Sequence, residues 1–260
     1  MWLEYLRIAW SVLRGNLFRS VLTVASIVIG AFSIVLMTSL AESGLGTLSR
    51  SFEELGGSRL ISIWRKAPEA MENKQTSYGR GLTRLDAPAL QSIPHLVTIT
   101  SFVSLTSQSM LTDAGKSRSA DVVAADEKFL SFFRYKIAEG RGLDAHDQLE
   151  HARVCVVGND LADMLWGKGE VVIGKVVTVQ GLHCRVVGRL TRLDRWGVGF
   201  GWEWDKVLVM PLETLADYQG KVADNGRRLF MLTDNPKHNE IVKRIINAQL
   251  LERHHGVDDF

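Results

Sequence analysis

Few residues in this chain of 260 amino acids have the types and spacing that nucleotide binding or catalysis requires. The nearest match is GEVVIGKV at 169–176, which follows the P-loop pattern as far as Lys175. A P-loop needs Ser or Thr after this lysine to bind Mg²⁺, and a helix that begins there. The chain instead has Val176 at the start of the strand-like run VVTV. We therefore expect a hairpin turn here and no bound ATP.

The histidines form no recognisable catalytic or metal-binding motif. The sequence contains neither the HExxH pattern of zinc proteases nor the GxSxG pattern of serine hydrolases. His146, His151 and His183 have no ligand-like spacing to the cysteines, and His254-His255 is expected to be solvated. The sequence thus predicts no catalytic residue, no metal ligand and no cofactor held by this chain, which is not expected to be an enzyme.

The two cysteines, Cys155 and Cys184, each lie in a short apolar run that is typical of a strand. They could form a disulfide if the domain is in an oxidising compartment. They could equally be two small buried hydrophobic residues. Sequence alone leaves both alternatives open, because it does not place their Cα atoms within bonding distance.

A segment of alternating glycine and aromatic residues, WGVGFGWEW, occupies positions 196–204. Its GxGxG core lacks the spacing and the following helix of a dinucleotide-binding site. Two arrangements fit: an exposed loop that contacts a partner protein or lipid, or a glycine-bent hairpin with its rings in the core. In the first arrangement the partner-binding residues are Trp196, Phe200, Trp202 and Trp204.

The elements that would position these residues begin with a membrane span at Ser20–Ala41. This stretch carries no charge, and at 1.5 Å per residue it makes a helix of about 33 Å, enough to cross a hydrocarbon core of about 30 Å. Residues 1–19 before it are expected to form an amphipathic helix at the cytoplasmic membrane interface. A cleaved signal peptide is the main alternative, although its apolar core is usually shorter.

The charges flanking the span predict its orientation. Arg7, Arg14 and Arg19 precede it, so the N-terminus is expected in the cytoplasm and everything from Glu42 onward outside. Residues 42–57 are expected to form a stalk that ends at a glycine pair, followed by an α+β domain at 58–260. A net charge of +2 gives no support to a nucleic-acid partner.

The pattern of the outer domain favours strands over helices. Strands are expected at 60–64, 97–111, 119–125, 154–157, 174–179, 184–190, 206–210 and 229–233. Helices are expected to begin at Asp86, at Glu127, at Asn159 and, after the cap Asn235 and Pro236, near the C-terminal end.

Several short segments, taken in order, carry a resemblance to a known family. They are RIAWSVLRGNLFRSVLT at 7–23, GSRLISI at 57–63, GRGL at 140–143, VCVVGNDLA at 154–162, GKVVTV at 174–179, RVVG at 185–188, VMPL at 209–212 and HGVDDF at 255–260. Together they resemble the first membrane helix and the periplasmic core domain of MacB/FtsX-type ABC transporter permeases.

The resemblance implies a function in the bacterial inner membrane. Such a permease relays motion from a cytoplasmic ABC ATPase, here expected on a separate chain that holds ATP and Mg²⁺, to its periplasmic domain. This mechanotransmission serves efflux, lipoprotein transport or peptide handling. The implied partners are a second permease copy or homologous permease, which makes a dimer, and a periplasmic adaptor, lipoprotein or cell-wall enzyme.

The resemblance also implies the architecture of the outer domain and a departure from the family. Two βαβ Porter-like units are expected at about 58–113 and 226–260, with an inserted β-rich subdomain at about 114–225. Permeases of this family carry three further membrane helices after this domain, so the resemblance implies a truncated chain or a companion chain with the remaining helices. The alternative function is a membrane-anchored periplasmic interaction module that activates or scaffolds a cell-envelope partner without transport. A secreted domain after signal cleavage is a third possibility.

Overall fold

The structure is a computed structural model that describes residues 4, 5, 7, 10, 15, 17–66, 81–112, 114–193, 195, 199–220 and 226–260. Most of the expected interfacial helix at 1–19 and the polar stretch 67–80 lie outside the described residues. Contacts within the chain divide it into two units, Met1–Arg50 and Ser51–Phe260, and each is described by itself.

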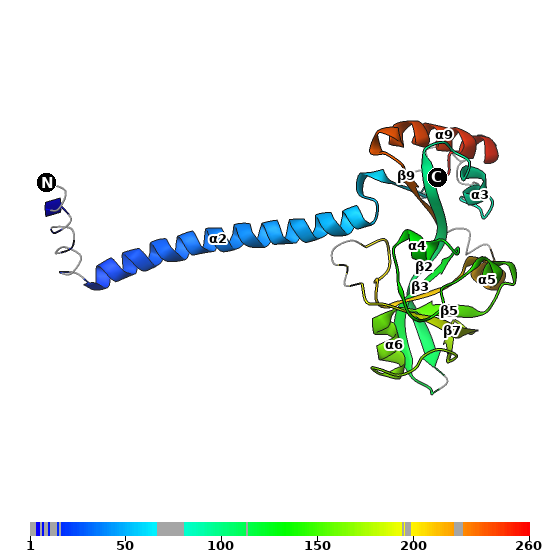
Figure 1. Cartoon of the computed structure of the whole chain (residues 1–260), viewed down its shortest axis with the longest axis horizontal. Coiled ribbons are helices and arrows are strands. Elements are labelled where there is room, and N and C mark those ends of the chain that lie inside the picture. Colours follow the sequence, from blue (N-terminus) through cyan, green and yellow to red (C-terminus); the bar gives the residue numbers. More distant parts are fainter. Residues whose placement is uncertain are drawn as a thin grey trace. The chain divides into compact units, whose positions relative to one another are not determined.

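The first unit consists mainly of α2 (Leu17–Glu54), an unbroken helix of 38 residues whose last turn belongs to the second unit (Figure 1). Its apolar side chains are exposed all round, as in a helix that meets lipid on every side. Thr23, Ser26 and Ser33 donate hydrogen bonds of 2.8 Å to carbonyls four residues earlier, which satisfies their hydroxyls within the helix. Among the described residues, α2 alone is long and apolar enough to cross a membrane.

The second unit is built on one nine-stranded sheet. The strands are β1 (Leu60–Trp64), β2 (Leu96–Thr112), β3 (Ser117–Ala125), β4 (Ile137–Gly140), β5 (Val154–Val157), β6 (Val176–Val179), β7 (Leu182–Leu190), β8 (Val207–Pro211) and β9 (Arg227–Thr233). Their order is β1-β9-β2-β3-β8-β5-β7-β4, and β6 pairs with both β2 and β7. The β3–β8 and β5–β7 pairs are parallel and the others antiparallel, so the sheet is mixed.

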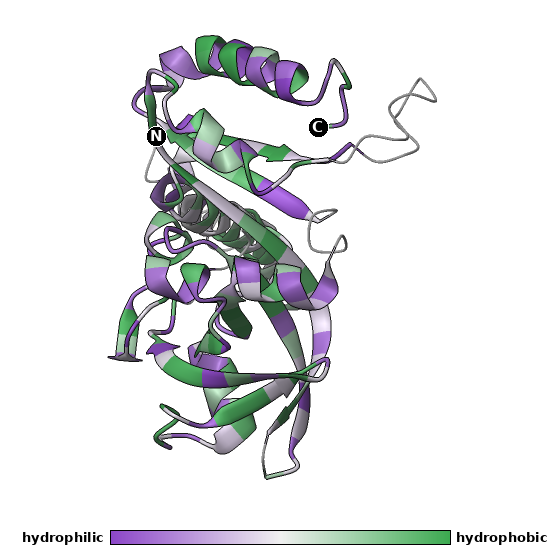
Figure 2. Ribbon diagram, turned by 90° about the vertical axis from the view of Figure 1, so that its right-hand side faces the viewer, coloured by the Kyte–Doolittle hydropathy of each residue, from purple (hydrophilic) through white to green (hydrophobic). Residues whose placement is uncertain are grey.

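Short helices cover this sheet. They are η1 (Gly57–Arg59), α3 (Asp86–Leu90), α4 (Phe129–Phe132), α5 (Ala145–Leu149), α6 (Asn159–Trp166), α7 (Leu212–Gln219), η4 (Pro236–His238) and α9 (Asn239–Arg253). Bands of hydrophobic and hydrophilic residues alternate along α9 (Figure 2). Val242, Ile246 and Leu250 recur every four residues and are buried, so α9 packs one face on the sheet.

The long strand β2 extends from the part of the sheet formed with β1 and β9 into the part that contains the other strands (Figure 1). Near its start Thr98 pairs with Leu232 of β9, and near its end Met110 pairs with Val179 of β6. Its register with β3 shifts between Leu105 and Gln108, as expected of a β-bulge that bends a long strand. One continuous strand therefore joins the β1-β9-β2 part to the rest of the sheet.

Three clusters of buried apolar residues stabilise the second unit. One lies between α3, α9 and the strands β1 and β9, and includes Ile61, Leu90 and Leu250. A second packs α6 and α7 against β5 and β7. The third is aromatic, with Phe102, Phe129, Phe133, Trp202, Trp204 and Phe230 among its members. We call this third cluster the aromatic core.

Each strand expected from the sequence is present, with bounds that differ by a few residues, whereas β4, α5 and α7 were not predicted. Cys155 and Cys184 are unpaired and buried in the adjacent strands β5 and β7, where they pack with apolar neighbours. Lys175 lies in a turn before β6, but the turn follows α6 and not a strand, so the prediction of a hairpin was wrong. The Lys175 amine instead pairs with Glu170 at 3.3 Å.

Candidate functional site: the junction of α2 with the aromatic core

The chain leaves α2 through a buried leucine and two glycines. Leu55 is 1% exposed within the aromatic core. Gly56 and Gly57 have φ angles of 106° and 53°, and residues other than glycine rarely adopt positive φ angles. A Cβ at Gly56 would also lie 2.1 Å from Leu232 Cδ2. The glycine pair therefore ends the helix and turns the chain closely past β9 into β1.

Arg195 joins the last turn of α2 to the aromatic core. Its Nη2 lies 3.7 Å from Glu54 Oε2, and its Nη1 donates a 2.7 Å hydrogen bond to the Phe133 carbonyl. Its guanidinium carbon lies 4.9 Å from the centroid of the Trp204 ring, within cation–π range. Burial of this side chain lowers the pKa of Arg195, and the nearby Glu54 carboxylate opposes that shift.

The Trp202 and Trp204 rings lie inside the domain, each residue being 5% exposed. The Trp202 ring centroid is 5.3 Å from those of Phe102, Phe133 and Trp204, in edge-to-face arrangements. Trp202 Nε1 donates to the Tyr135 hydroxyl at 3.2 Å, which donates in turn to the Trp204 carbonyl at 3.3 Å. Burial raises the pKa of Tyr135, which keeps this hydroxyl protonated.

This burial corresponds to the second arrangement expected for the glycine–aromatic segment, with its rings in the core. The segment is irregular at 199–206 and forms no hairpin strands there. Phe200 is half-buried, with its ring 5.0 Å from Phe230, and Trp196 lies outside the described residues. Partner binding by Trp196, Phe200, Trp202 and Trp204 stays a prediction. The rings of Phe129 and Phe133 on and beside α4 explain why the tryptophans fold inward.

His254 is not solvated, in contrast to the expectation from its place near the C-terminal end. Its side chain is 7% exposed and bridges two carboxylates, with Nδ1 2.7 Å from Asp259 and Nε2 3.2 Å from Asp86. Asp259 also accepts a 2.8 Å hydrogen bond from the Gly81 N–H. Burial opposes the charged imidazolium, but hydrogen bonds to Asp259 and Asp86 outweigh it and raise the pKa of His254. This polar cluster fastens residues 254–260 to α3.

Sequence reasoning missed the residues of the junction other than the glycine pair and the tryptophans. Arg195 directly precedes the glycine–aromatic segment, so a basic residue next to several tryptophans was the signal available in the sequence. Glu54, Leu55, Gly56 and Arg195 therefore form one packed junction with the aromatic core, at the place where the second unit begins.

Comparison with protein families gives a match to the family described as MacB-like periplasmic core domain, over residues 20–249. Among curated relatives, the macrolide export ATP-binding/permease protein MacB of Wolinella succinogenes is 23% identical over 99% of this chain and 38% of its own length. The pyoverdine export ATP-binding/permease protein PvdT of Pseudomonas entomophila is 25% identical, with the same coverage. The chain thus spans less than two-fifths of the length of these relatives.

Two solved structures share the fold. The periplasmic region of MacB from Actinobacillus actinomycetemcomitans aligns with a TM-score of 0.62 at 16% identity, over 80% of this chain and 90% of that structure. The extracellular domain of the ABC-type transporter YknZ from Gram-positive bacteria aligns with a TM-score of 0.61 at 15% identity, over 77% of this chain and 96% of that structure. The mixed α/β domain is therefore built like the periplasmic domains of MacB-type transporters.

Proposed function

Because the chain belongs to the family of MacB-like periplasmic core domains, we propose that it is the permease subunit, or the N-terminal part of one, of a MacB-type ABC transporter. In this role it relays ATP-driven motion from a cytoplasmic ATPase, held on a separate chain, to the extracytoplasmic domain. The motion serves export or the handling of lipoproteins or peptides. The observation that carries the proposal is the unbroken helix α2, which Leu55 of the aromatic core directly follows and whose last residue, Glu54, pairs with Arg195.

The physical argument rests on the stiffness of α2. A helix of 38 residues is about 57 Å long, and about 20 residues suffice to cross a bilayer. The remaining turns continue without a proline up to Glu54, and the helix is unbroken through Ser43-Gly44, a type of pair at which helices can kink. A displacement of the membrane end is then passed to Leu55 and Arg195, because both are packed in the domain.

The experiment that tests the relay changes the stiffness of α2 and keeps the domain intact. Seven residues are inserted between Glu42 and Ser43, either as a flexible Gly/Ser segment or as a helix-forming segment of Ala, Glu and Lys. The helical insert keeps the faces of α2 in phase within about 20°, since seven residues make nearly two turns. Amide hydrogen exchange of the domain is measured in native membranes with and without ATP.

We expect an ATP-dependent change in exchange for the unaltered chain and for the helical insert, and its loss with the flexible insert. An equal response in both variants would contradict a mechanical relay. The partners are identified by pulling down the tagged chain in mild detergent, followed by mass spectrometry. An ABC ATPase with a second permease copy or a multi-span companion chain supports the proposal. A cell-wall hydrolase without an ATPase would instead favour the anchored interaction module.

The proposal includes the finer assignment of two Porter-like βαβ units. Strands β1 and β2, joined through α3, lie on either side of β9 and antiparallel to it, which supports a first unit. The second would begin with β9 and α9, and the same crossover would bring its closing strand to the outer edge of β1. A groove of about 570 Å³ along β1 and α9 includes Ile61, Trp64 and Lys243 in its lining. We propose that a further strand, such as one from a companion chain, pairs with β1 in this groove.

A further inference from the structure

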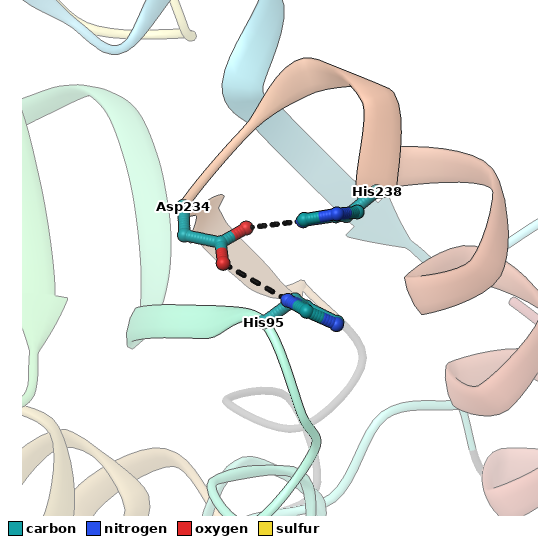
Figure 3. Close-up of side chains that lie close together, drawn as sticks. All are labelled: His95, Asp234 and His238. Atoms are coloured by element: carbon teal, nitrogen blue, oxygen red, sulfur yellow. Dashed lines mark hydrogen bonds and ion pairs between the residues drawn. The ribbon is translucent and has the colours of Figure 1, made fainter.

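Two histidines and an aspartate meet at one end of strands β9 and β2. His95 directly precedes β2, Asp234 directly follows β9, and His238 is the last residue of η4. Their side chains point toward one another from these three segments (Figure 3). The separation of 139 residues between His95 and Asp234 explains why no local sequence motif reveals the cluster.

The Asp234 carboxylate is shared between the two imidazoles. Its Oδ2 lies 2.9 Å from His95 Nδ1, and its Oδ1 lies 2.7 Å from His238 Nδ1. The ring centroids of the two histidines are 3.8 Å apart, and one ligand-type atom from each of the three residues lies within 4.8 Å of the others. Ligands of tetrahedral Zn²⁺ lie about 2.0–2.1 Å from the metal and hence about 3.4 Å from one another. Small side-chain rotations would therefore bring these atoms to coordinating distances.

The backbone around the cluster is held in place. The Asp234 N–H donates a 3.0 Å hydrogen bond to the His95 carbonyl. His95 itself has a φ of 68°, a left-handed conformation that histidine adopts more often than most residues with a side chain. Asn235 caps η4 by accepting a 3.0 Å hydrogen bond from the Lys237 N–H. The two imidazoles and the carboxylate are thus already close together without a bound ion.

We propose that His95, Asp234 and His238 bind a divalent first-row transition metal ion, for which Zn²⁺ is the best match. Two imidazoles with one carboxylate are typical Zn²⁺ ligands, whereas Mg²⁺ and Ca²⁺ select oxygen ligands. The side chains are 42%, 46% and 38% exposed, in the order His95, Asp234, His238. This exposure leaves at least one coordination position open to water or to a group from a partner.

The proposed metal site lies next to the segment that follows α2. Thr233, beside Asp234, donates a 3.2 Å hydrogen bond to the Arg59 carbonyl, and Asn239, beside His238, donates one of 2.6 Å to the Ser58 carbonyl. A metal ion that ties His95, before β2, to Asp234 and His238, before and at the end of η4, would therefore brace the residues that hold η1. The bound ion would stiffen the domain where the chain enters it from the membrane.

The test uses the full chain in detergent micelles, without a polyhistidine tag, and Zn²⁺ alone as the probe. Competition with a chromophoric chelator measures stoichiometry and affinity. We expect one Zn²⁺ per chain, with the affinity reduced about tenfold or more by His95→Gln or His238→Gln and lost in the double variant. His183→Gln removes an exposed imidazole of β7 that bonds to Thr178, and serves as the matched control with unchanged affinity.

A second measurement needs no variant and covers the case in which a substitution disturbs folding. X-ray absorption of the Zn²⁺-loaded unaltered chain is expected to show two imidazole nitrogens and oxygen donors around the metal. Far-UV circular dichroism checks that each variant is folded. The proposal is overturned if the unaltered chain binds Zn²⁺ no more tightly than the double variant, or if sulfur from Cys155 or Cys184 is found among the ligands.

Discussion

The substitution Trp202→Ala is expected to destabilise the domain strongly, because Trp202 connects the segment 199–206 to the aromatic core. The residue is 5% exposed and its ring contacts Phe102 and Phe133 edge-on. Removing a buried tryptophan side chain costs about 3–5 kcal/mol, since both the transfer free energy and the packing around the cavity are lost. For a domain of this size each kcal/mol lowers the melting temperature by about 2–4 °C, so we expect a loss of about 6–20 °C.

Two further variants separate the ring from its hydrogen bond and provide a control. Trp202→Phe keeps a six-membered ring in the core but loses the 3.2 Å bond to Tyr135 and the rest of the indole. The lost bond is expected to cost about 1 kcal/mol, and the smaller ring adds a packing cost to this. Trp64→Ala removes a tryptophan that is 58% exposed, so its free energy of unfolding is expected to change by no more than about 0.5 kcal/mol.

The free energy of unfolding is measured by urea titration of the full chain in detergent micelles, followed by circular dichroism at a helical wavelength. This signal does not depend on the fluorescence of the tryptophan that is removed. If Trp202→Ala costs no more than Trp64→Ala, the ring is not part of the core in solution. If the variant is also folded but loses a membrane partner, the exposed-loop arrangement of residues 196–204 is correct and the assignment to the core is wrong.

Three other perturbations probe the junction and the cluster around His254. Gly56→Ala combines a positive φ with a methyl group 2.1 Å from a neighbouring leucine carbon, so urea titration should show a loss of about 1–3 kcal/mol. Arg195→Met removes a buried charge-assisted hydrogen bond and should cost about 2 kcal/mol, whereas Glu54→Gln, at an exposed partner, should cost less than about 1 kcal/mol in the same assay. The raised pKa of His254 gives a stabilisation that is complete below its ordinary value of 6.5 and is lost as the pH rises through the raised pKa. Burial raises the pKa of Asp86, but hydrogen bonds from Arg253, Thr83 and His254 lower it overall. The stabilisation from Asp86 is therefore present above pH 3.8 and is lost as the pH falls through the lowered pKa. The melting temperature should thus be highest between pH 3.8 and pH 6.5.

Each of these perturbations has a control within the chain. Gly199→Ala adds a methyl group to open space at an exposed glycine and should leave the unfolding free energy within about 0.5 kcal/mol. Asp259→Asn removes one carboxylate from His254 and should weaken the loss of stability above pH 6.5. If Arg195→Met proves no more destabilising than Glu54→Gln, Arg195 does not anchor the end of α2. An unchanged pH profile in Asp259→Asn would show that the pair of His254 with Asp259 is not its source.

The features that follow from local pattern were predictable from the sequence. The uncharged run 20–41 falls within α2, and the β-rich composition of 97–111 placed the longest strand, β2, within a residue at each end. The glycine pair at 56 and 57 marked the end of α2, because glycine is the residue that most readily adopts the positive φ angles found there. The order of the short segments also pointed to the family, although none of them is specific alone.

The features that depend on distant partners could not be predicted. His95 and Asp234 come together only because β2 and β9 are neighbours, and no property of either residue foretells this. His254 lies near the C-terminal end, where solvation is the usual expectation, yet it is buried between Asp86 of the distant α3 and Asp259 of its own terminal segment. The two arrangements of the glycine–aromatic segment differ only in whether other rings are nearby, and residues 129–133 supply them through the fold.

The continuity of β2 has a consequence for how the domain responds to heat. Its 17 residues pair with β9, β3 and β6, so the two ends of the sheet share one backbone ladder. Melting either end would leave half of this ladder without partners, which penalises partly unfolded states. We therefore expect residues 51–260 to melt in one cooperative transition, with calorimetric and van't Hoff enthalpies that agree.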